Sequence, residues 1–378
     1  MASGRSVVEP VRVAVIGCGL IGRRRAEIVH RSVTDELVIV ADVDESRAEA
    51  VGDEMGCFAT SNWQEVVERD DVDIVVVSTS NDWLTPISVA ALQCGKHVLV
   101  EKPAARSPKE ALSILQAAGR SIQTAATARA QDTTHCGPDS RPTVRIGFNH
   151  RHHPAVWKAH ELFAQGVIGD VLFVRCRYGH GGRPGYDKEW RADPQIAGGG
   201  ELLDQGIHAV DLFRWFLGDF AEAFGFTGTN YWKLGCFPAG RNEHPLLAGS
   251  RAEDNAFALF RTSTGQTASL HASWTQWKNL FSYEVFGQDG YLTVEGLGGS
   301  YGPERLIWGC RRPESGPPDE QVFDFPGPDI SWAAEWQEFV TAIREGREPL
   351  TNANDGLQAI RMVYAVYESS RTGQVVRL

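Results

Sequence analysis

The stretch Val11–Gly22, VRVAVIGCGLIG, decides the fold of this chain. Its first half is a short apolar run rich in β-branched residues, which favours a strand. Its second half is the pattern GxGxxG, and the segment that follows is typical of a helix as far as about His30. The pattern alone is weak evidence, but its position between a strand and a helix makes it specific.

Strands and helices alternate through the first third of the chain. Apolar runs predict further strands at 37–43, 73–79, 97–103 and 143–149, with helical segments between the earlier ones. The run at 73–79, DIVVVST, is continuous, as expected for a strand that is buried on both faces of a sheet. This order predicts an α/β protein that begins with a Rossmann domain, a doubly wound parallel sheet.

One long segment interrupts this order. A helix is expected to begin at the capping box Ser107–Glu110 and to end at Gly119. The segment 119–143 is polar, rich in alanine and threonine, and has no apolar period. We therefore expect a loop insertion at 119–143 within the first domain.

An acidic residue follows the glycine pattern at the spacing that dinucleotide binding requires. Asp42 ends the second predicted strand, 20 residues after Gly22. Gly17 permits the tight turn, Gly19 lets the backbone approach a pyrophosphate, and Gly22 lets helix and strand pack closely. Asp42 can accept hydrogen bonds from the adenosine ribose and would repel a 2′-phosphate. The sequence thus favours NAD over NADP.

The second part of the chain has a different pattern. Successive strand-like segments joined by short turns, from 256 to 308, predict a mostly antiparallel sheet. In the segment 266–274, Ala268, Leu270, Ala272 and Trp274 alternate with Thr267, Ser269, His271 and Ser273, which predicts two unlike faces. The segment 314–320 is expected to be a surface loop. We place the domains at 8–150 and 151–378.

Composition excludes several classes of partner. The chain has 378 residues and a formal net charge of −11, which argues against general affinity for nucleic acid or anionic membranes. Its 7 cysteines form no CxxC pair, so no disulfide framework or zinc site is expected. The first residues lack the apolar run of a signal peptide, and no stretch has the length of a membrane span. We expect a cytoplasmic, soluble protein.

Two stretches contain residues suited to chemistry. Lys102, in the tripeptide EKP, follows a predicted parallel strand, at the edge of the sheet where ligands bind. Asp204 and His208 lie four residues apart in GGGELLDQGIH (198–208), which begins a helix that is apolar on most sides. Buried polar groups are costly unless they are paired or used, so this pair is a candidate site.

These motifs together resemble the Gfo/Idh/MocA oxidoreductases. The resemblance rests on VAVIGCGLIG, VADVD, the stretch from STSNDW to VLVEKP, GFNHRHHP, GGGELLDQGIHAVDL and the closing DGLQAIRMVYAVYESSRTGQVV. It implies a second α/β domain with an open, mostly antiparallel sheet. It also implies catalytic roles for Lys102, Asp204 and His208. His208 would take the hydroxyl proton, Asp204 would orient the substrate, and Lys102 would hold the substrate oxygen.

The resemblance implies further contacts. Candidate cofactor-binding residues are Gly17, Gly19, Leu20, Ile21, Gly22, Asp42, Thr79, Ser80, Asn81, Glu101 and Lys102. Candidate substrate-binding residues are Asn149, Arg151, Trp190, Arg191, Tyr178, His180 and Tyr186. The chain departs from many relatives at Thr85, where they have histidine. The run His150–His153 suggests a metal, but it has no carboxylate at ligand spacing, so we expect none.

Three functions are open at this stage. The first is an NAD-dependent dehydrogenase acting on a ring hydroxyl of a sugar, sugar derivative or cyclitol. The second is a glycosidase that uses bound NAD in a transient oxidation and elimination, and the third is a sensor without catalysis. A homodimer or homotetramer built through the open face of the second sheet is also expected. Trp277, Phe281, Tyr283 and Phe286 lie near this sheet, although not all can point to the same side.

Overall fold

The computed structural model describes residues 10–128, 141–182, 185, 188–232 and 252–378. The chain divides into two compact units. The first comprises Met1–Ala104, Lys109–Gly147 and Glu335–Asn354, and the second comprises Ala105–Pro108, Phe148–Ala334 and Asp355–Leu378. The segment Glu335–Asn354 thus groups with the first unit, whereas the sequence suggested a single boundary near residue 150.

The first unit contains the predicted parallel sheet of a Rossmann domain. Its six strands lie in the order β3-β2-β1-β4-β5-β6, and every neighbouring pair is parallel. Because β1 lies between β2 and β4, the strand order reverses there, which is where such sheets bind their ligands. The bounds are β1 Val11–Ile16, β2 Asp35–Ala41, β3 Phe58–Thr60, β4 Ile74–Val77, β5 His97–Glu101 and β6 Val144–Gly147.

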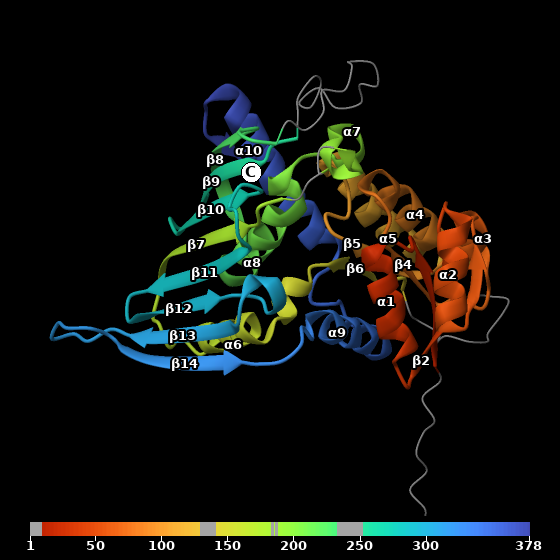
Figure 1. Cartoon of the computed structure of the whole chain (residues 1–378), viewed down its shortest axis with the longest axis horizontal. Coiled ribbons are helices and arrows are strands. Elements are labelled where there is room, and N and C mark those ends of the chain that lie inside the picture. The colour runs from red at the N-terminus through yellow and green to blue at the C-terminus, as the bar shows by residue number, and fades with distance from the viewer. Residues whose placement is uncertain (1–9, 129–140, 183–184, 186–187, 233–251) are drawn as a thin grey trace, which may run out of the picture. The chain divides into compact units, whose positions relative to one another are not determined.

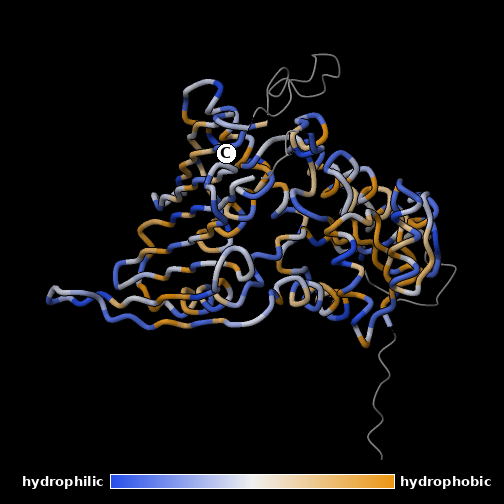
Figure 2. The backbone as a smooth tube through the Cα atoms, in the orientation of Figure 1, coloured by the Kyte–Doolittle hydropathy of each residue, from blue (hydrophilic) through white to orange (hydrophobic). Residues whose placement is uncertain are grey.

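Apolar side chains hold helices against this sheet. Trp336, Phe339 and Val340 of α9 join residues of the strands and of α1 and α2 in one core cluster, which explains why 335–354 groups with the first unit. Figure 2 shows hydrophobic residues along the strands of this unit. The helices are α1 Leu20–His30, α2 Glu45–Met55, α3 Trp63–Glu68, α4 Asn81–Gln93, α5 Pro108–Ala128 and α9 Ser331–Glu345.

The expected end of α5 at Gly119 is wrong. The helix continues to Ala128, so the first part of the predicted loop insertion is helical. Glycine inside a helix costs only about 1 kcal/mol relative to alanine, and the alanines around Gly119 favour the helix. The rest of the expected insertion, residues 129–140, lies outside the described residues.

The second unit contains a nine-stranded sheet of order β14-β13-β12-β11-β7-β10-β9-β8-β15. Only the pair β7 and β10 is parallel, so the sheet is mostly antiparallel, as predicted. The bounds are β7 Val171–Gly179, β8 Phe220–Gly228, β9 Asn255–Thr262, β10 Thr267–Ser273, β11 Leu280–Gly287, β12 Gly290–Glu295, β13 Glu304–Cys310, β14 Asp319–Phe325 and β15 Val376–Arg377.

Two strands were not anticipated. β14 begins at Asp319, inside the segment 314–320 that was expected to be a loop, and β8 was not predicted at all. Most side chains of β14 are exposed, so it lacks the alternation that marks a half-buried strand. Figure 2 shows that the tip joining β13 to β14 is hydrophilic.

Helices cover one face of this sheet. α6 (Pro154–Ala164) packs on β12, β13 and β14, and α8 (Ile207–Leu217) packs on β7. Two serine hydroxyls of α10 (Ala353–Thr372) accept hydrogen bonds from backbone N–H groups of β8. Figure 1 shows α6, α8 and α10 beside the strands of this unit. Among the described residues, no helix is both long and apolar enough to cross a membrane.

The two faces of β10 differ as predicted. Ala268, Leu270 and Ala272 are buried on the covered face, whereas Thr267, Ser269 and His271 are partly exposed. Ser273, which was expected on the open face, is only 1% exposed and does not contribute to the exposed surface there. Phe281 and Tyr283 are likewise buried, and Tyr283 stacks on Phe213 of α8. They therefore belong to the core rather than to the open face.

Buried charges tie the first unit together. Arg25 of α1 forms ion pairs of 2.6 Å with Glu101 at the end of β5 and with Glu335 of α9. Arg145 of β6 lies 3.6 Å from Glu335 and also pairs with Glu338. The side chains of Arg25, Arg145 and Glu335 are at most 1% exposed, so each charge depends on its partners to offset desolvation.

We predict that Arg25→Met destabilises the protein strongly, because it leaves Glu101 and Glu335 buried beside fewer cations. Removing one partner of a buried ion pair typically costs about 3–5 kcal/mol. Urea unfolding followed by tryptophan fluorescence measures the loss. The control is Arg24→Met, one residue earlier on the exposed side of α1. Equal losses in the two variants would contradict the prediction.

Candidate functional site

The turn between β1 and α1 leaves space above its backbone. A Cβ atom on Gly22 would lie 1.6 Å from the carbonyl oxygen of Gly17, so helix and strand approach too closely for any side chain there. At Gly19, in contrast, a Cβ atom would meet nothing within 4 Å. Leu20, the first residue of α1, is 85% exposed. The turn therefore offers the N-terminus of α1 to a ligand, which suits the pyrophosphate of a dinucleotide.

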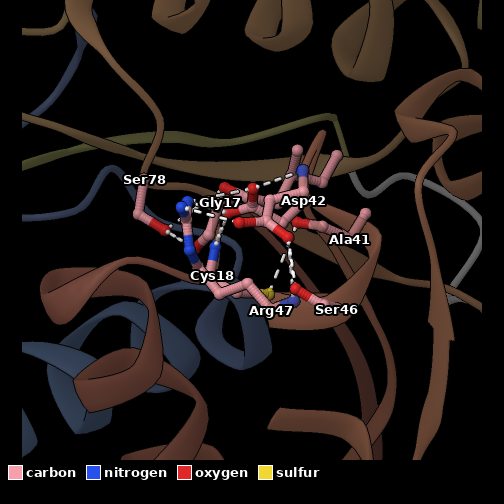
Figure 3. Close-up of polar contacts among 9 residues, drawn as sticks. Gly17, Cys18, Ala41, Asp42, Ser46, Arg47 and Ser78 are labelled. Atoms are coloured by element: carbon pink, nitrogen blue, oxygen red, sulfur yellow. Dashed lines mark hydrogen bonds and ion pairs between the residues drawn. The ribbon is translucent and has the colours of Figure 1, made fainter. Parts of the chain in front are cut away.

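Asp42 lies beside this turn, as the sequence predicted for a ribose-binding carboxylate (Figure 3). It accepts hydrogen bonds from the backbone N–H groups of Cys18 at 2.7 Å and Asp44 at 2.9 Å. Arg47 of α2 donates to both of its oxygens, at 3.1 and 3.2 Å, and also pairs with Asp44. The carboxylate is thus held in position, and a half-exposed cation lies next to it.

The ends of β4 and β5 contain the other cofactor candidates. Ser80 is the N-cap of α4, its hydroxyl donates to Asp82 at 2.6 Å, and Asn81 begins the helix. Glu101 belongs to the buried ion-pair cluster, and burial raises its pKa although Arg25 opposes this. Lys102 is partly exposed, and Ala104 two residues later has φ of 73°, a strained value for a residue with a side chain.

In the second unit, the stretch 198–208 begins with a π-helical turn. The turn η4 spans Leu202–Gly206 and continues directly into α8. Asp204 therefore lies in the π-turn and His208 in the α-helix, rather than both in one α-helix as predicted. Such π-turns inside helices are frequent at functional sites.

Glu253 holds the start of this helix. Its carboxylate accepts from the backbone N–H groups of Gly200 at 2.9 Å and Leu202 at 3.0 Å, and from the Tyr367 hydroxyl at 2.8 Å. Its backbone oxygen accepts from the N–H of Glu201 at 3.0 Å. Burial raises the pKa of Glu253 to about 7 despite these hydrogen bonds. The carboxylate thus caps orphan N–H groups that a helix start leaves open.

Candidate residues gather around Asp204. Arg191 lies 3.8 Å from the Asp204 carboxylate, and its guanidinium lies over the ring of Trp190 at 4.4 Å. Both belong to the short helix η3 Trp190–Ala192, which is followed by α7 Pro194–Ala197. Asp204 is partly exposed, so a ligand can reach it together with Arg191.

His208 is buried among aromatic rings. It is 5% exposed and stacks on His150, with ring centroids 3.8 Å apart, and it packs edge-to-face with Phe148, with ring centroids 5.9 Å apart. The ring centroid of Tyr178, in β7, lies 6.5 Å from that of His208. Asp204, His208, Tyr178 and Arg191 thus all belong to the second unit, whereas Lys102 belongs to the first.

The remaining candidates make contacts within the protein. Arg151 forms a bidentate ion pair with Asp211, with N–O distances of 2.6 and 2.8 Å, and it is 4% exposed. Asn149 donates to Ser331 at 2.8 Å. The His180 ring accepts from the N–H of Gly182 at 2.8 Å. Tyr186 lies outside the described residues.

Sequence reasoning missed Glu253 and the stacking of His150 on His208. Glu253 follows a polar, glycine-rich stretch without periodicity, so no sequence signal could have placed it at the helix start. His150 was considered only as a metal ligand. Among the described residues, no three His, Cys, Asp or Glu side chains are placed to share a metal ion.

Comparison with known proteins agrees with this geometry. The model of the oxidoreductase family with an NAD-binding Rossmann fold matches residues 11–127, and the Gfo/Idh/MocA C-terminal domain model matches residues 156–293.

Named relatives act on sugars and cyclitols. Levoglucosan dehydrogenase of Pseudarthrobacter phenanthrenivorans is 24% identical over 82% of this chain and 81% of its own length. Inositol 2-dehydrogenase of Rubrobacter xylanophilus is 26% identical over 97% of this chain and 92% of its own.

A solved structure covers nearly the whole chain. The oxidoreductase domain protein of Kribbella flavida superimposes with a TM-score of 0.80 at 25% identity, over 97% of this chain and 99% of that one. The two family models together span more than half of the residues. This chain is therefore a member of the Gfo/Idh/MocA family of oxidoreductases, with an NAD-binding Rossmann domain at its N-terminal end.

Proposed function

We propose that this protein is an NAD-dependent dehydrogenase that oxidises a ring hydroxyl of a sugar, sugar derivative or cyclitol to the ketone. The observation that carries the proposal is the buried, aromatic setting of His208, four residues from a reachable carboxylate, Asp204. Asp204 also lies 3.8 Å from Arg191, so the helix segment that contains His208 presents a charged pair that a ligand can reach. The dehydrogenases among the relatives support the substrate class.

Each residue has a role in this proposal. His208 takes the proton of the substrate hydroxyl as general base, because imidazole can be neutral at physiological pH. Asp204, together with Arg191, hydrogen-bonds the substrate and orients it. Lys102 stabilises the negative charge that develops on the substrate oxygen. NAD, when bound, accepts the hydride from the carbinol carbon.

We predict that Lys102→Ala and His208→Ala each lower kcat by about 10²–10⁴-fold, the usual contribution of a positioned acid or base. NADH formation, followed by absorbance with a panel of sugars and inositols, measures this rate. NAD binding should change little in either variant. The controls are Lys109→Ala and His30→Ala, which alter exposed residues of α5 and α1.

The same assay separates the alternatives. A glycosidase that uses NAD transiently would cleave chromogenic glycosides without accumulating NADH, and a sensor would bind the cofactor without turnover. A near-normal rate in the His208→Ala variant would contradict the role of His208 as general base and would show that another residue takes the proton.

We predict that NAD binds at least about tenfold more tightly than NADP, a difference of about 1.4 kcal/mol. Asp42 places a carboxylate where the 2′-phosphate would lie. Calorimetry with both cofactors measures the preference, and Asp42→Ser should narrow it. Arg47→Ala is the informative control, because Arg47 contacts Asp42 and is the cation able to accept a 2′-phosphate. Equal binding of both cofactors by the unaltered protein would contradict the predicted preference for NAD.

We further propose a homodimer or homotetramer that assembles through the open face of the second sheet. Large apolar side chains are exposed on the two strands that flank β10, including Phe257 and Leu259 of β9 and Phe173 of β7. Exposed apolar patches of this kind usually mark interfaces.

We predict a mass in light scattering that is a multiple of 41.5 kDa at micromolar concentration. Leu259→Arg should lower that mass, because it introduces a charge opposite Ser269 on the open face. Val33→Arg, at a 99% exposed position of the first unit, is the control. A monomeric mass for the unaltered chain would reject the oligomer. An unchanged mass in Leu259→Arg would move the interface elsewhere.

A further inference from the structure

A second histidine lies against the proposed base. His150 belongs to the short helix η1 Asn149–His152, and its ring stacks on His208 with an interplanar angle of 22°. Both histidines are 5% exposed. A face-to-face stack makes no hydrogen bond between the rings, so no proton passes directly from one to the other. What His150 does for His208 depends on how His150 itself is held.

The hydrogen bonds on one side of His150 have a defined direction. Asp329 can only accept, so the Ser331 hydroxyl donates to it at 2.6 Å. The Ser331 oxygen then accepts from the amide nitrogen of Asn149 at 2.8 Å. The Asn149 amide oxygen must therefore face His150, whose Nδ1 lies 3.2 Å away. Because that oxygen only accepts, Nδ1 of His150 carries a hydrogen.

The second ring nitrogen of His150 extends this chain of hydrogen bonds. Nε2 of His150 lies 3.0 Å from the Tyr178 hydroxyl, which also hydrogen-bonds Tyr301. Tyr301 in turn accepts from the side-chain nitrogen of Gln205 at 3.2 Å. Burial raises the pKa of Tyr178 and raises that of Tyr301 to about 12, so both phenols keep their hydrogens near neutral pH.

When His150 is neutral, these hydrogen bonds form one chain in which all donors point in the same direction. Each group from Gln205 to Ser331 donates to the next, and Asp329 accepts the last hydrogen bond. A proton added to Nε2 of His150 would oppose the hydrogen that Tyr178 donates there, and the two phenols would have to reorient. A charge on His150 would also face His208 across the 3.8 Å stack.

Other titratable groups face this pair. His153 lies 5.4 Å from the His150 ring, and its Nδ1 is 3.1 Å from Glu304 of β13. Glu201 and Asp204 of the helix start act electrostatically on Tyr178 and Tyr301. The stacked rings are otherwise flanked by the apolar rings of Phe148 and Phe281.

We propose that His150 is a positioning residue for His208. The chain of hydrogen bonds from Gln205 to Asp329 holds His150 neutral and in one orientation. The His150 ring then orients the His208 ring by stacking on it, and His208 is the ring that takes up the substrate proton. This inference rests on the proposed role of His208 as the base. It assigns a function to the run 150–153 that does not involve a metal.

The kcat values of His150 variants test this positioning role. His150→Ala should lower kcat by about 10–100-fold, because displacement of a catalytic group by about 1 Å can cost 10²-fold. The dissociation constant of NAD should stay unchanged. His150→Phe keeps a ring in the stack and should recover most of the lost rate. His160→Ala is the control, since His160 makes an equivalent 3.8 Å stack on Trp215.

The outcomes of the kinetic test are distinct. A normal kcat in His150→Ala would overturn the proposal, and so would a His150→Phe variant no faster than His150→Ala. Thermal unfolding of each variant, measured beside the rates, identifies a change that merely unfolds the protein.

A second measurement does not depend on turnover. In the full chain labelled with ¹⁵N-histidine and without cofactor, long-range ¹H–¹⁵N correlation spectra report which ring nitrogen of each histidine is protonated. Near pH 7.5 we expect His150 to be neutral with its hydrogen on Nδ1. Ser331→Ala should weaken this preference, because the Asn149 amide is then free to turn.

Replacement of His150 identifies its signals among the 11 histidines. A positively charged His150, or a hydrogen on Nε2 alone, would overturn the proposal. If no substrate in the panel is oxidised, the dehydrogenase function fails, and this spectrum still decides whether the chain of hydrogen bonds holds His150 as inferred.

Discussion

In each of the two units, the backbone around the candidate residues depends on close approaches that only glycine permits. A Cβ atom on Gly22 would lie 1.6 Å from the Gly17 oxygen, and one on Gly200 would lie 2.1 Å from the backbone oxygen of Glu253. The first approach sets α1 against β1 and leaves the helix N-terminus accessible above Gly19. The second lets Glu253 reach the N–H groups that begin the helix of Asp204 and His208. In each unit, the absence of a side chain brings backbone donors to a carboxylate or a ligand.

Buried carboxylates then give these regions their geometry. Asp42 accepts from the backbone of the glycine turn, Glu253 from the start of the π-turn, and Glu101 pairs with Arg25 next to Lys102 in sequence. Burying such groups is costly, so each persists only with well-placed donors. A site assembled from satisfied buried charges has few alternative arrangements, which is what positioned chemistry requires.

Local patterns in the sequence were sufficient for much of this architecture. The GxGxxG turn, Asp42 and the alternation in β10 each depend on a few neighbouring residues, and the structure has all three as expected. The end of α5 failed because Gly119 is a weak helix breaker among alanines. The Glu253 cap and the His150 stack join residues far apart in the chain, and no periodicity encodes such contacts. The π-turn is local, but it interrupts the helix without a signal in the apolar pattern. Ser273 lies on the side that the alternation predicts, opposite Asn255, which contacts His271, but it is buried at the end of β10.

Contacts within the second unit hold His150, the residue proposed to position His208. The groups that hold His150 come from η1, η4, β7, the short helix η5 (Gly299–Tyr301) and the start of α9 with the preceding Asp329, all within that unit. The proposed positioning of His208 by His150 therefore rests on contacts within that unit. Lys102 is the one proposed catalytic residue of the first unit, and it follows the buried Glu101 and precedes the strained Ala104. Its backbone thus lies between a buried ion pair and a residue of strained backbone conformation, which limits the conformations open to this segment.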